Sequence, residues 1–270
     1  MPEGDTIFRT AKTLTKALVG HTVVGFDTRV GQIRALGPQR LVGQTIERVE
    51  PRGKHLLIWF APSDLVLHTH MRMSGSWHVY RAGERWRKPE HLARAVVTVD
   101  GWVAVCFSAP VCRLLSRAQL ERDPSVAALG PDALDEETDL SEAGRRLQQR
   151  GDWTIGEALL DQRVLAGVGN VYKSEVLFIH RVDPWTPVAE VPGEVRDQLL
   201  ATAERLLKDN VRDGAVARTT TPPGTSTGRL FVYGRARRPC ARCATPIRRA
   251  RQGEQARLTY WCPRCQGPGP

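Results

Sequence analysis

Two Cys-x-x-Cys pairs near the end of this chain limit its possible folds more than any other feature of the sequence. Cys240 and Cys243 form the first pair, Cys262 and Cys265 form the second, and 18 residues separate the two pairs. Each pair can occupy a tight turn and supply two thiolates, and four thiolates at this spacing suit one tetrahedral zinc ion. The residues between the pairs are numerous enough to form a β-hairpin. The pattern therefore predicts a small C-terminal module built around one structural Zn²⁺, with no open ligand position for catalysis.

The net charge of the chain is concentrated in the same region. Residues 216–270 contain 11 arginines, no lysine and a single acid, Glu254, which is a balance of +10. The whole chain also carries +10, so the residues before this segment are neutral overall. Because clustered arginines attract phosphates, we expect the C-terminal module to bind a polyanion.

Length and composition indicate a folded, soluble protein. With 270 residues, of which 41% are hydrophobic and 25% charged, the chain can form two domains and a small appendage. No stretch approaches a membrane span, and the early charges at Asp5, Arg9 and Lys12 exclude a signal-peptide apolar region. We expect a cytoplasmic protein with no membrane partner, in which Cys106 and Cys112 are buried, reduced thiols.

The first half of the chain has mainly the pattern of β-structure. Residues 5–19 predict an amphipathic helix, because Ile7, Ala11, Leu14 and Leu18 recur at helical spacing. Seven β-branched or aromatic runs follow, separated by Gly, Pro and Asp turns, at 22–27, 44–49, 55–60, 65–69, 77–80, 95–99 and 102–107. Strands at this spacing favour a sandwich or a barrel.

Helical patterns dominate the second half, after an acidic stretch at 123–139 that has the composition of a linker. The predicted helices cover 141–150, 154–160, 170–179 and 195–212. A loop rich in Thr, Pro and Gly then leads from residue 219 to residue 228 and on to the cysteine module.

A glycine-rich turn precedes one of these helices. Gly167 and Gly169 permit tight backbone turns, and Asn170 suits the N-cap of the helix that follows. Unpaired N–H groups at such a helix start can bind phosphate. No strand precedes the turn, which argues against a dinucleotide site. An ordinary helical hairpin is an equally good explanation of this turn taken alone.

Gly156-Glu-Ala-Leu-Leu-Asp-Gln162 and the following segment 165–178 resemble the helix–two-turns–helix motif of the formamidopyrimidine-DNA glycosylase / endonuclease VIII family. Further matches occur in the family's order over nearly the whole chain. They are Met1-Pro2-Glu3-Gly4, Gly53-Lys54-His55-Leu56-Leu57, the wedge-loop segment His70-Met-Arg-Met-Ser-Gly75, Val232-Tyr233-Gly234-Arg235, and Arg257-Leu-Thr-Tyr-Trp-Cys262.

The resemblance implies an α+β fold with three parts: an N-terminal β-sandwich with an N-terminal helix, a helical helix–two-turns–helix domain, and a C-terminal zinc-finger β-hairpin. The segments expected on this basis are the catalytic β-sandwich domain 1–122, a linker 123–138, the DNA-binding helical domain 139–218, a lesion-capping loop and connector 219–234, and the zinc finger 235–270. The implied partner is damaged double-stranded DNA, bound by a monomer in the bacterial cytoplasm at the nucleoid.

The activity that the resemblance implies is base-excision repair by a bifunctional DNA glycosylase/AP lyase. Once Met1 is removed, Pro2 would supply an α-amine. Such amines titrate near ~8 and lysines near ~10.4, so the α-amine is the better nucleophile at neutral pH. It would attack the sugar C1′, expel the base as a Schiff base forms, and cleave the strand by β,δ-elimination. Glu3 would do acid–base work at the sugar and the leaving base. Lys54 would bind phosphate or donate a proton.

Other residues are assigned by the resemblance to holding the DNA. Asn170 would bind a phosphate beside the lesion. Arg257, which we group with the catalytic residues, would clamp the same region bidentately. Lys173, Tyr233 and Arg235 complete the predicted DNA-binding set.

The target base must leave the stack, and a wedge must fill the space that it vacates. Met73 is our candidate for the wedge, with Arg72 or Met71 assisting. The loop 219–228 resembles the family's mobile lesion-capping loop.

Two departures from the family pattern bear on the lesion. Thr6 stands where many members carry Glu, and Asp5, one residue earlier on a helix, points elsewhere and is no simple replacement. The Asn-Asp-Pro-Arg-Arg-Phe type of loop of purine-directed members is replaced by Phe107-Ser-Ala-Pro-Val-Cys-Arg-Leu114. The chain therefore resembles the bacterial endonuclease VIII branch, which predicts the removal of oxidised pyrimidines. The open alternatives are a purine-directed (8-oxoguanine/formamidopyrimidine) glycosylase of the same family and a non-catalytic zinc-ribbon DNA-binding protein.

Overall fold

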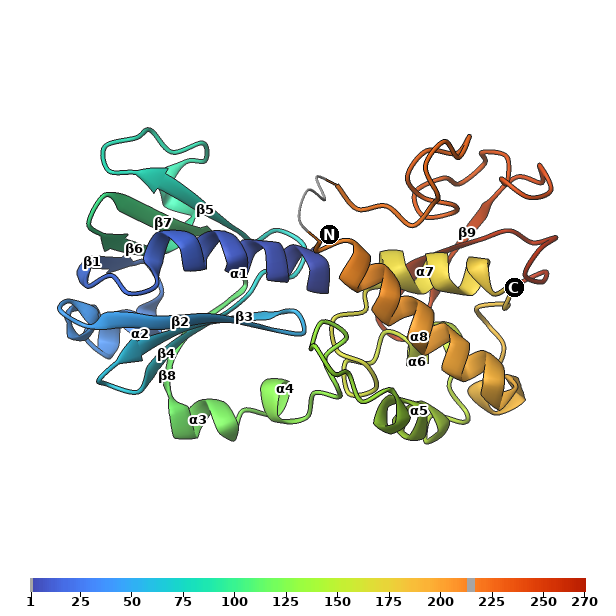
Figure 1. Ribbon diagram of the computed structural model, residues 1–270, viewed down its shortest axis with the longest axis horizontal. Coiled ribbons are helices and arrows are strands. Elements are labelled where there is room, and N and C mark those ends of the chain that lie inside the picture. Colours follow the sequence, from blue (N-terminus) through green and yellow to red (C-terminus); the bar gives the residue numbers. More distant parts are fainter. Residues whose placement is uncertain (1, 213–216) are drawn as a thin grey trace. The chain divides into compact units, whose positions relative to one another are not determined.

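The computed structural model describes residues 2–212 and 217–270, and the chain divides into two compact units, Met1–Ala128 and Leu129–Pro270 (Figure 1). Separate clusters of buried apolar side chains lie within each unit. The boundary between the units falls inside the segment 123–138. The finer division into five segments stays a prediction.

Two four-stranded antiparallel sheets form the β-sandwich of the first unit. One sheet has the order β1-β6-β7-β5, with β1 at Val23–Thr28, β6 at Ala93–Val99, β7 at Trp102–Phe107 and β5 at Ser76–Arg81. The other has the order β2-β3-β4-β8, with β2 at Thr45–Arg52, β3 at His55–Ala61, β4 at Leu65–His70 and β8 at Val111–Ser116. The sandwich and the seven predicted strands are confirmed.

Strand β8 was not predicted from the sequence. It is an edge strand that pairs only with β4 within the described sheet. Its inward residues Cys112 and Leu114 alternate with the half-exposed Val111 and Arg113, which is the period-2 pattern of a half-buried strand. That alternation could have revealed β8.

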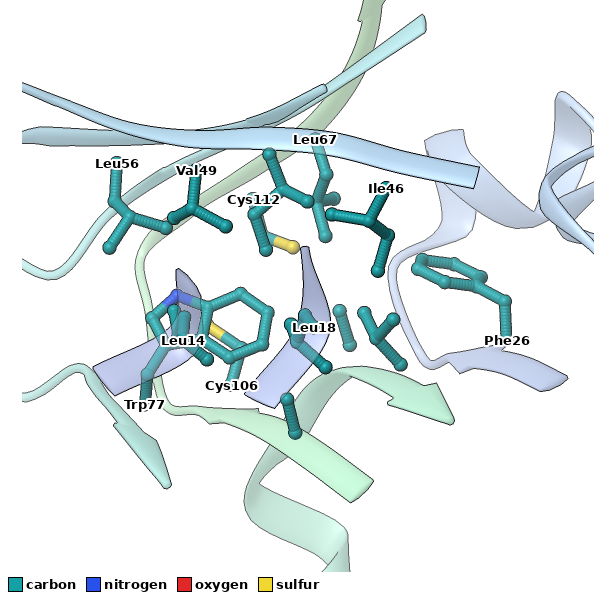
Figure 2. Close-up of a cluster of buried hydrophobic side chains, with 14 of the residues drawn as sticks. Leu14, Leu18, Phe26, Ile46, Val49, Leu56, Leu67, Trp77, Cys106 and Cys112 are labelled. Carbon is teal, nitrogen blue, oxygen red and sulfur yellow. The ribbon is translucent and has the colours of Figure 1, made fainter. Parts of the chain in front are cut away.

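Helix α1 (Gly4–Leu18) packs its apolar side into the core of the first unit. Ile7, Ala11, Leu14 and Leu18 are all buried, so the predicted amphipathic helix is confirmed. Figure 2 shows Leu14 and Leu18 among side chains from both sheets, close to Cys106 and Cys112.

Cys106 on β7 and Cys112 on β8 are buried and form no disulfide, as predicted. Burial raises the pKa of Cys112 to about 12 and that of Cys106 far above its usual value. Both side chains are therefore protonated at neutral pH and behave as small apolar groups.

Short helical segments complete the first unit. They are α2 (Gly31–Ala35), η1 (Pro38–Leu41), η2 (Glu90–Leu92), α3 (Arg117–Glu121) and α4 (Pro124–Ala127). Asp123 caps α4 by accepting the N–H of Ser125 at 3.0 Å. The acidic segment that was predicted to be only a linker thus begins with an ordered helix.

The second unit is helical up to the cysteine module. Its helices are α5 (Leu140–Gln148), α6 (Ile155–Ala158), α7 (Asn170–Ile179), η3 (Val188–Glu190) and α8 (Gly193–Asp209). The four predicted helices are confirmed, with ends that shift by a few residues. Helix α7 is buried on all sides except its C-terminal end, which explains its weakly amphipathic sequence.

The predicted β-hairpin between the cysteine pairs is present. It consists of β9 (Arg248–Gln252) and β10 (Arg257–Trp261), paired antiparallel with Trp261 opposite Arg248. A separate apolar cluster joins the hairpin to the helices, because Phe178 of α7 packs with Val232, Ile247 and Tyr260. Among the described residues, no helix has the length and apolar character needed to cross a membrane.

Candidate functional site

The four cysteines of the C-terminal module converge on one point. Their sulfur atoms all lie within 4.8 Å of one another. Cys240 Sγ is 3.9 Å from Cys265 Sγ, and Cys243 Sγ is 3.4 Å from the sulfurs of Cys262 and Cys265. Four sulfurs at about 2.3 Å from a tetrahedral zinc would be about 3.8 Å apart. The group can therefore hold a metal ion, and its dimensions fit Zn²⁺.

Arginines of the cysteine module also serve its own structure. The guanidinium of Arg242 donates to the carbonyls of Phe178 (2.6 Å) and Ile179 (3.0 Å) at the C-terminal end of α7. Arg235 donates to the carbonyls of Phe231 and Pro239. These two arginines thus have structural partners, whereas others such as Arg249 on β9 are exposed.

The glycine-rich turn and the β9–β10 hairpin meet at Asn170. Asn170 is the first residue of α7, one position after the N-cap Gly169, so the predicted N-cap was wrong by one residue. Its side chain is 4% exposed, and Nδ2 donates to the carbonyl of Leu258 at 2.6 Å. Within residues 2–212 and 217–270 its Oδ1 has no hydrogen-bond partner. The contact places Asn170 beside β10, whose first residue is Arg257.

Behind Asn170 lies a buried polar network that the sequence reasoning missed. Lys173 Nζ donates to Thr259 Oγ1 at 2.6 Å, and Thr259 donates to Gln252 Oε1 at 2.7 Å. Gln252 Nε2 continues the network to Thr154 and to the carbonyl of Pro184. Lys173 is fully buried, so its amine ties α7 to the hairpin in this structure. Its contact with DNA stays a prediction.

A second buried group, Glu175, holds the segment that leads into the cysteine module. Its carboxylate accepts the N–H groups of Phe231 (2.7 Å), Val232 (2.8 Å) and Tyr233 (2.8 Å), and also the hydroxyl of Thr220. Burial raises the pKa of Glu175, and these hydrogen bonds oppose the rise. Glu175 therefore fixes the backbone at Tyr233, which carries a predicted DNA contact.

In the first unit, the predicted nucleophile lies at the start of α1. Pro2 is half-exposed and Glu3 is fully buried. The carbonyl of Glu3 accepts the N–H groups of Thr6 (2.9 Å) and Ile7 (3.1 Å), so the helix begins directly after it. Asp5 is buried and lies 3.3 Å from the Arg9 guanidinium, which agrees with the inference that it does not replace a glutamate at position 6.

Lys54 lies half-exposed in the tight turn between β2 and β3, where Gly53 has a φ of +57°. This turn is in the same unit as Pro2, Glu3 and the predicted wedge.

The predicted wedge loop, His70 to Gly75, presents Met73 to solvent with 62% of its surface exposed. Arg72 is also exposed, but Met71 is 2% exposed and belongs to the core. Gly75 is required here, since a Cβ would lie 2.7 Å from Met71 Cα. The backbone thus turns tightly under Met73, and of the three candidates only Met71 is buried.

Three histidines near Lys54 were not predicted to be functional. His55 and His68 are buried, and His55 Nδ1 lies 2.8 Å from His68 Nε2. His70 stands edge-on to His55, with 4.7 Å between the ring centroids. Burial is the main cause that lowers the pKa of His55 to about 3 and the pKa values of His68 and His70 to about 4.

Comparison with known proteins decides the family. Residues 1–110 match the formamidopyrimidine-DNA glycosylase N-terminal domain, and residues 129–221 match the formamidopyrimidine-DNA glycosylase H2TH domain. A probable endonuclease 8 2 from Streptomyces coelicolor is 44% identical over 100% of this chain and 96% of its own length. The chain belongs to the formamidopyrimidine-DNA glycosylase family.

Further relatives agree with the predicted branch and fold. The DNA-(apurinic or apyrimidinic site) lyase Nei2 of Mycolicibacterium smegmatis is 38% identical over 98% of this chain and 99% of its own. A formamidopyrimidine-DNA glycosylase from Methylococcus capsulatus is 32% identical over 98% of this chain. The order of these identities is consistent with the endonuclease VIII branch. The solved structure of Lactococcus lactis formamidopyrimidine-DNA glycosylase with N7-benzyl-Fapy-dG DNA shares the fold, with 22% identity, a TM-score of 0.82 and 98% coverage of this chain and 99% of the other.

Proposed function

We propose that this protein is a bifunctional DNA glycosylase/AP lyase of base-excision repair that acts on damaged double-stranded DNA. The observation that carries the proposal is the full-length similarity to an endonuclease 8 2, combined with the retained Pro2, Glu3, Lys54 and four-cysteine cluster. We further propose that it works as a monomer in the bacterial cytoplasm, at the nucleoid.

In the proposed reaction, the Pro2 amine forms a bond to the sugar C1′ while the glycosidic bond breaks and the departing base takes up a proton. The C1′–O4′ bond of the sugar then breaks, with a proton going to O4′, as the nitrogen lone pair forms the iminium. The iminium makes the C2′ proton acidic, and loss of that proton expels the 3′ phosphate by β-elimination. A second elimination releases the 5′ phosphate. Glu3, next in sequence to the amine, would exchange protons with the sugar and the leaving base. Lys54 would bind a phosphate of the lesion strand.

The second unit would hold the DNA. We propose that Asn170 and Arg257, which β10 brings close together, bind phosphates beside the lesion. Tyr233 and Arg235 would extend this surface. One Zn²⁺ held by the four cysteines would keep the hairpin folded, and it has no part in the chemistry.

We propose oxidised pyrimidines as the main substrates. The connection between β7 and β8 is only Ser108 to Pro110, and its central residue Ala109 is 1% exposed. So short a turn leaves no room for the arginine- and phenylalanine-bearing loop that purine-directed members are expected to carry. A panel of duplexes tests this: rapid excision of 8-oxoguanine opposite cytosine with slow excision of thymine glycol would contradict the substrate class.

Borohydride trapping on a duplex with one abasic site tests the proposed activity. The wild-type protein should form a covalent adduct, and Pro2→Gly should form far less because the secondary amine is lost. Binding to the same duplex without an adduct at any pH would instead favour a non-catalytic zinc-ribbon DNA-binding protein.

A further inference from the structure

A line of polar side chains crosses the sheet that contains β3, β4 and β8, and its two histidines are buried. We call it the histidine chain, and its members in order are Asp123, Arg113, His68 and His55. Asp123 Oδ2 lies 2.6 Å from Arg113 Nη2, Arg113 Nη2 lies 3.1 Å from His68 Nδ1, and His68 Nε2 lies 2.8 Å from His55 Nδ1. His68 is 0% exposed and His55 is 7% exposed. No step of the proposed mechanism uses these residues.

Arg113 fixes where the protons of the histidine chain lie. A guanidinium can only donate, so His68 Nδ1 must accept. A neutral His68 then carries its proton on Nε2 and donates it to His55 Nδ1. His55 in turn carries its own proton on Nε2. The two hydrogen bonds from Arg113 to His55 therefore run in one direction, and Arg113 also donates to Asp123.

Burial and the charged or titratable groups of the neighbouring elements together set the pKa values of the two imidazoles. Burial lowers both pKa values most, while His70, on β4, and Arg113, on β8, lower the pKa of His55 further. Asp123, at the start of α4, opposes them. Arg52 lies opposite His55 in the β2–β3 register, and Lys54 acts on the adjacent His70.

The far end of the histidine chain adjoins two predicted site segments. His55 follows Lys54 directly in the sequence, and its ring contacts His70 edge-on. His70 Nδ1 accepts the N–H of Arg72 at 3.1 Å. Arg72 has a φ of +45°, a conformation that residues with a side chain rarely adopt, so this hydrogen bond supports a strained position in the wedge loop.

We propose that the histidine chain is a positioning element that holds Lys54 and the wedge loop in the conformation that engages a flipped nucleotide. The inference rests on the proposed glycosylase/lyase function. Two neutral imidazoles with fixed protons suit this task, because they order the side chains without placing a second positive charge beside Lys54. A proton on the adjoining His70 would be repelled by both Lys54 and Arg72.

Two polar substitutions at His68 test the proposal, since each keeps one of its two hydrogen bonds. In His68→Gln the amide reaches the position of Nε2 and can still donate to His55. In His68→Asn the amide oxygen reaches the position of Nδ1 and can accept only from Arg113. His91→Gln, at an exposed histidine of the same unit, is the matched control. Each protein is assayed by urea unfolding, hydrogen exchange of residues 70–75 without DNA, and single-turnover cleavage of an abasic duplex from pH 5.5 to 8.5.

We expect His68→Asn to cleave about ten- to hundredfold more slowly than wild type, because a small displacement of a catalytic group has effects of this size. Exchange of residues 70–75 should be faster, and the acid limb of the pH profile should move upward as the pKa of His55 returns toward 6.5. His68→Gln should recover most of the rate, and His91→Gln should match wild type.

Equal rates and exchange in all variants would overturn the proposal. A cleavage rate that falls in both His68 variants only in proportion to their unfolded fraction, with an unchanged pH profile, would also overturn the proposal. The histidine chain would then contribute only to stability. An inactive wild type would refute the proposed function instead. The exchange of residues 70–75 would still decide whether the histidine chain orders the loop.

Discussion

Among single residues, Glu175 holds a distant backbone segment in place, and no sequence motif predicted this role. It accepts three consecutive backbone N–H groups from a part of the chain more than fifty positions away. Glu175→Gln replaces one acceptor oxygen by a donor that faces these N–H groups. We expect a loss of about 1–3 kcal/mol in the free energy of unfolding and faster hydrogen exchange at residues 231–233. Glu194→Gln, at an exposed position on α8, is the control, and unchanged exchange at 231–233 in Glu175→Gln would contradict this role.

The three histidines near Lys54 also make stability depend on pH. Unfolded histidines bind a proton near pH 6.5, whereas folded His55, His68 and His70 do so only near pH 3 to 4. Their pKa values are lowered by folding, so the stability is present above pH 6.5 and is lost as the pH falls toward 4. Each neutral histidine should contribute a slope on the order of 1 kcal/mol per pH unit in that window.

Urea unfolding of wild type and His68→Gln between pH 7.5 and 4.5 measures this contribution as the difference between two slopes, which cancels the carboxylates common to both. The variant should lose less stability on acidification. If the plots of unfolding free energy against pH are parallel for the two proteins, His68 takes up its proton in the folded protein as readily as in the unfolded one.

At the scale of elements, two methionines of one loop should behave oppositely. Met71→Ala removes a buried side chain and should cost about 2–5 kcal/mol of unfolding free energy. Met73→Ala removes an exposed one and should change stability by less than about 0.5 kcal/mol. Its effect should be on binding: affinity for a duplex with an abasic-site analogue should fall while melting is unchanged. If Met73→Ala binds the duplex and flips the nucleotide as wild type does, Met73 is not the wedge.

The regular elements could be predicted because their signals are local. The apolar spacing of α1, the glycine turn before α7 and the two cysteine pairs each lie within a short stretch of sequence. The contacts that were missed join positions far apart, such as Lys173 with Thr259 and Glu175 with Val232. A buried lysine or glutamate looks like a surface residue in the sequence, because its partner is chosen by the tertiary structure. The burial of Met71 was harder still to predict. Met71 and Met73 are the same residue type in the same loop, and only the direction in which the turn points each side chain makes one buried and the other exposed.

For the molecule as a whole, the cysteine cluster should support the second unit and leave the first intact. Apolar packing around Phe178 and the Arg242 bonds to α7 depend on the folded module. Removal of metal by a chelator should therefore abolish DNA binding and strand cleavage, and hydrogen exchange should rise at residues 235–265 while α1 and the two sheets of the sandwich stay protected. A chelated, metal-free protein that keeps its lyase activity would contradict this dependence.

In the proposed reaction the nucleophile is the amine of Pro2. Mass spectrometry of the borohydride-trapped complex, after digestion of the DNA and of the protein with trypsin, identifies the residue that carries the sugar remnant. We predict that the remnant is on the N-terminal peptide, residues 2–9, attached to the proline nitrogen. A remnant found on the peptide that contains Lys54, with an unmodified N-terminal peptide, would contradict it.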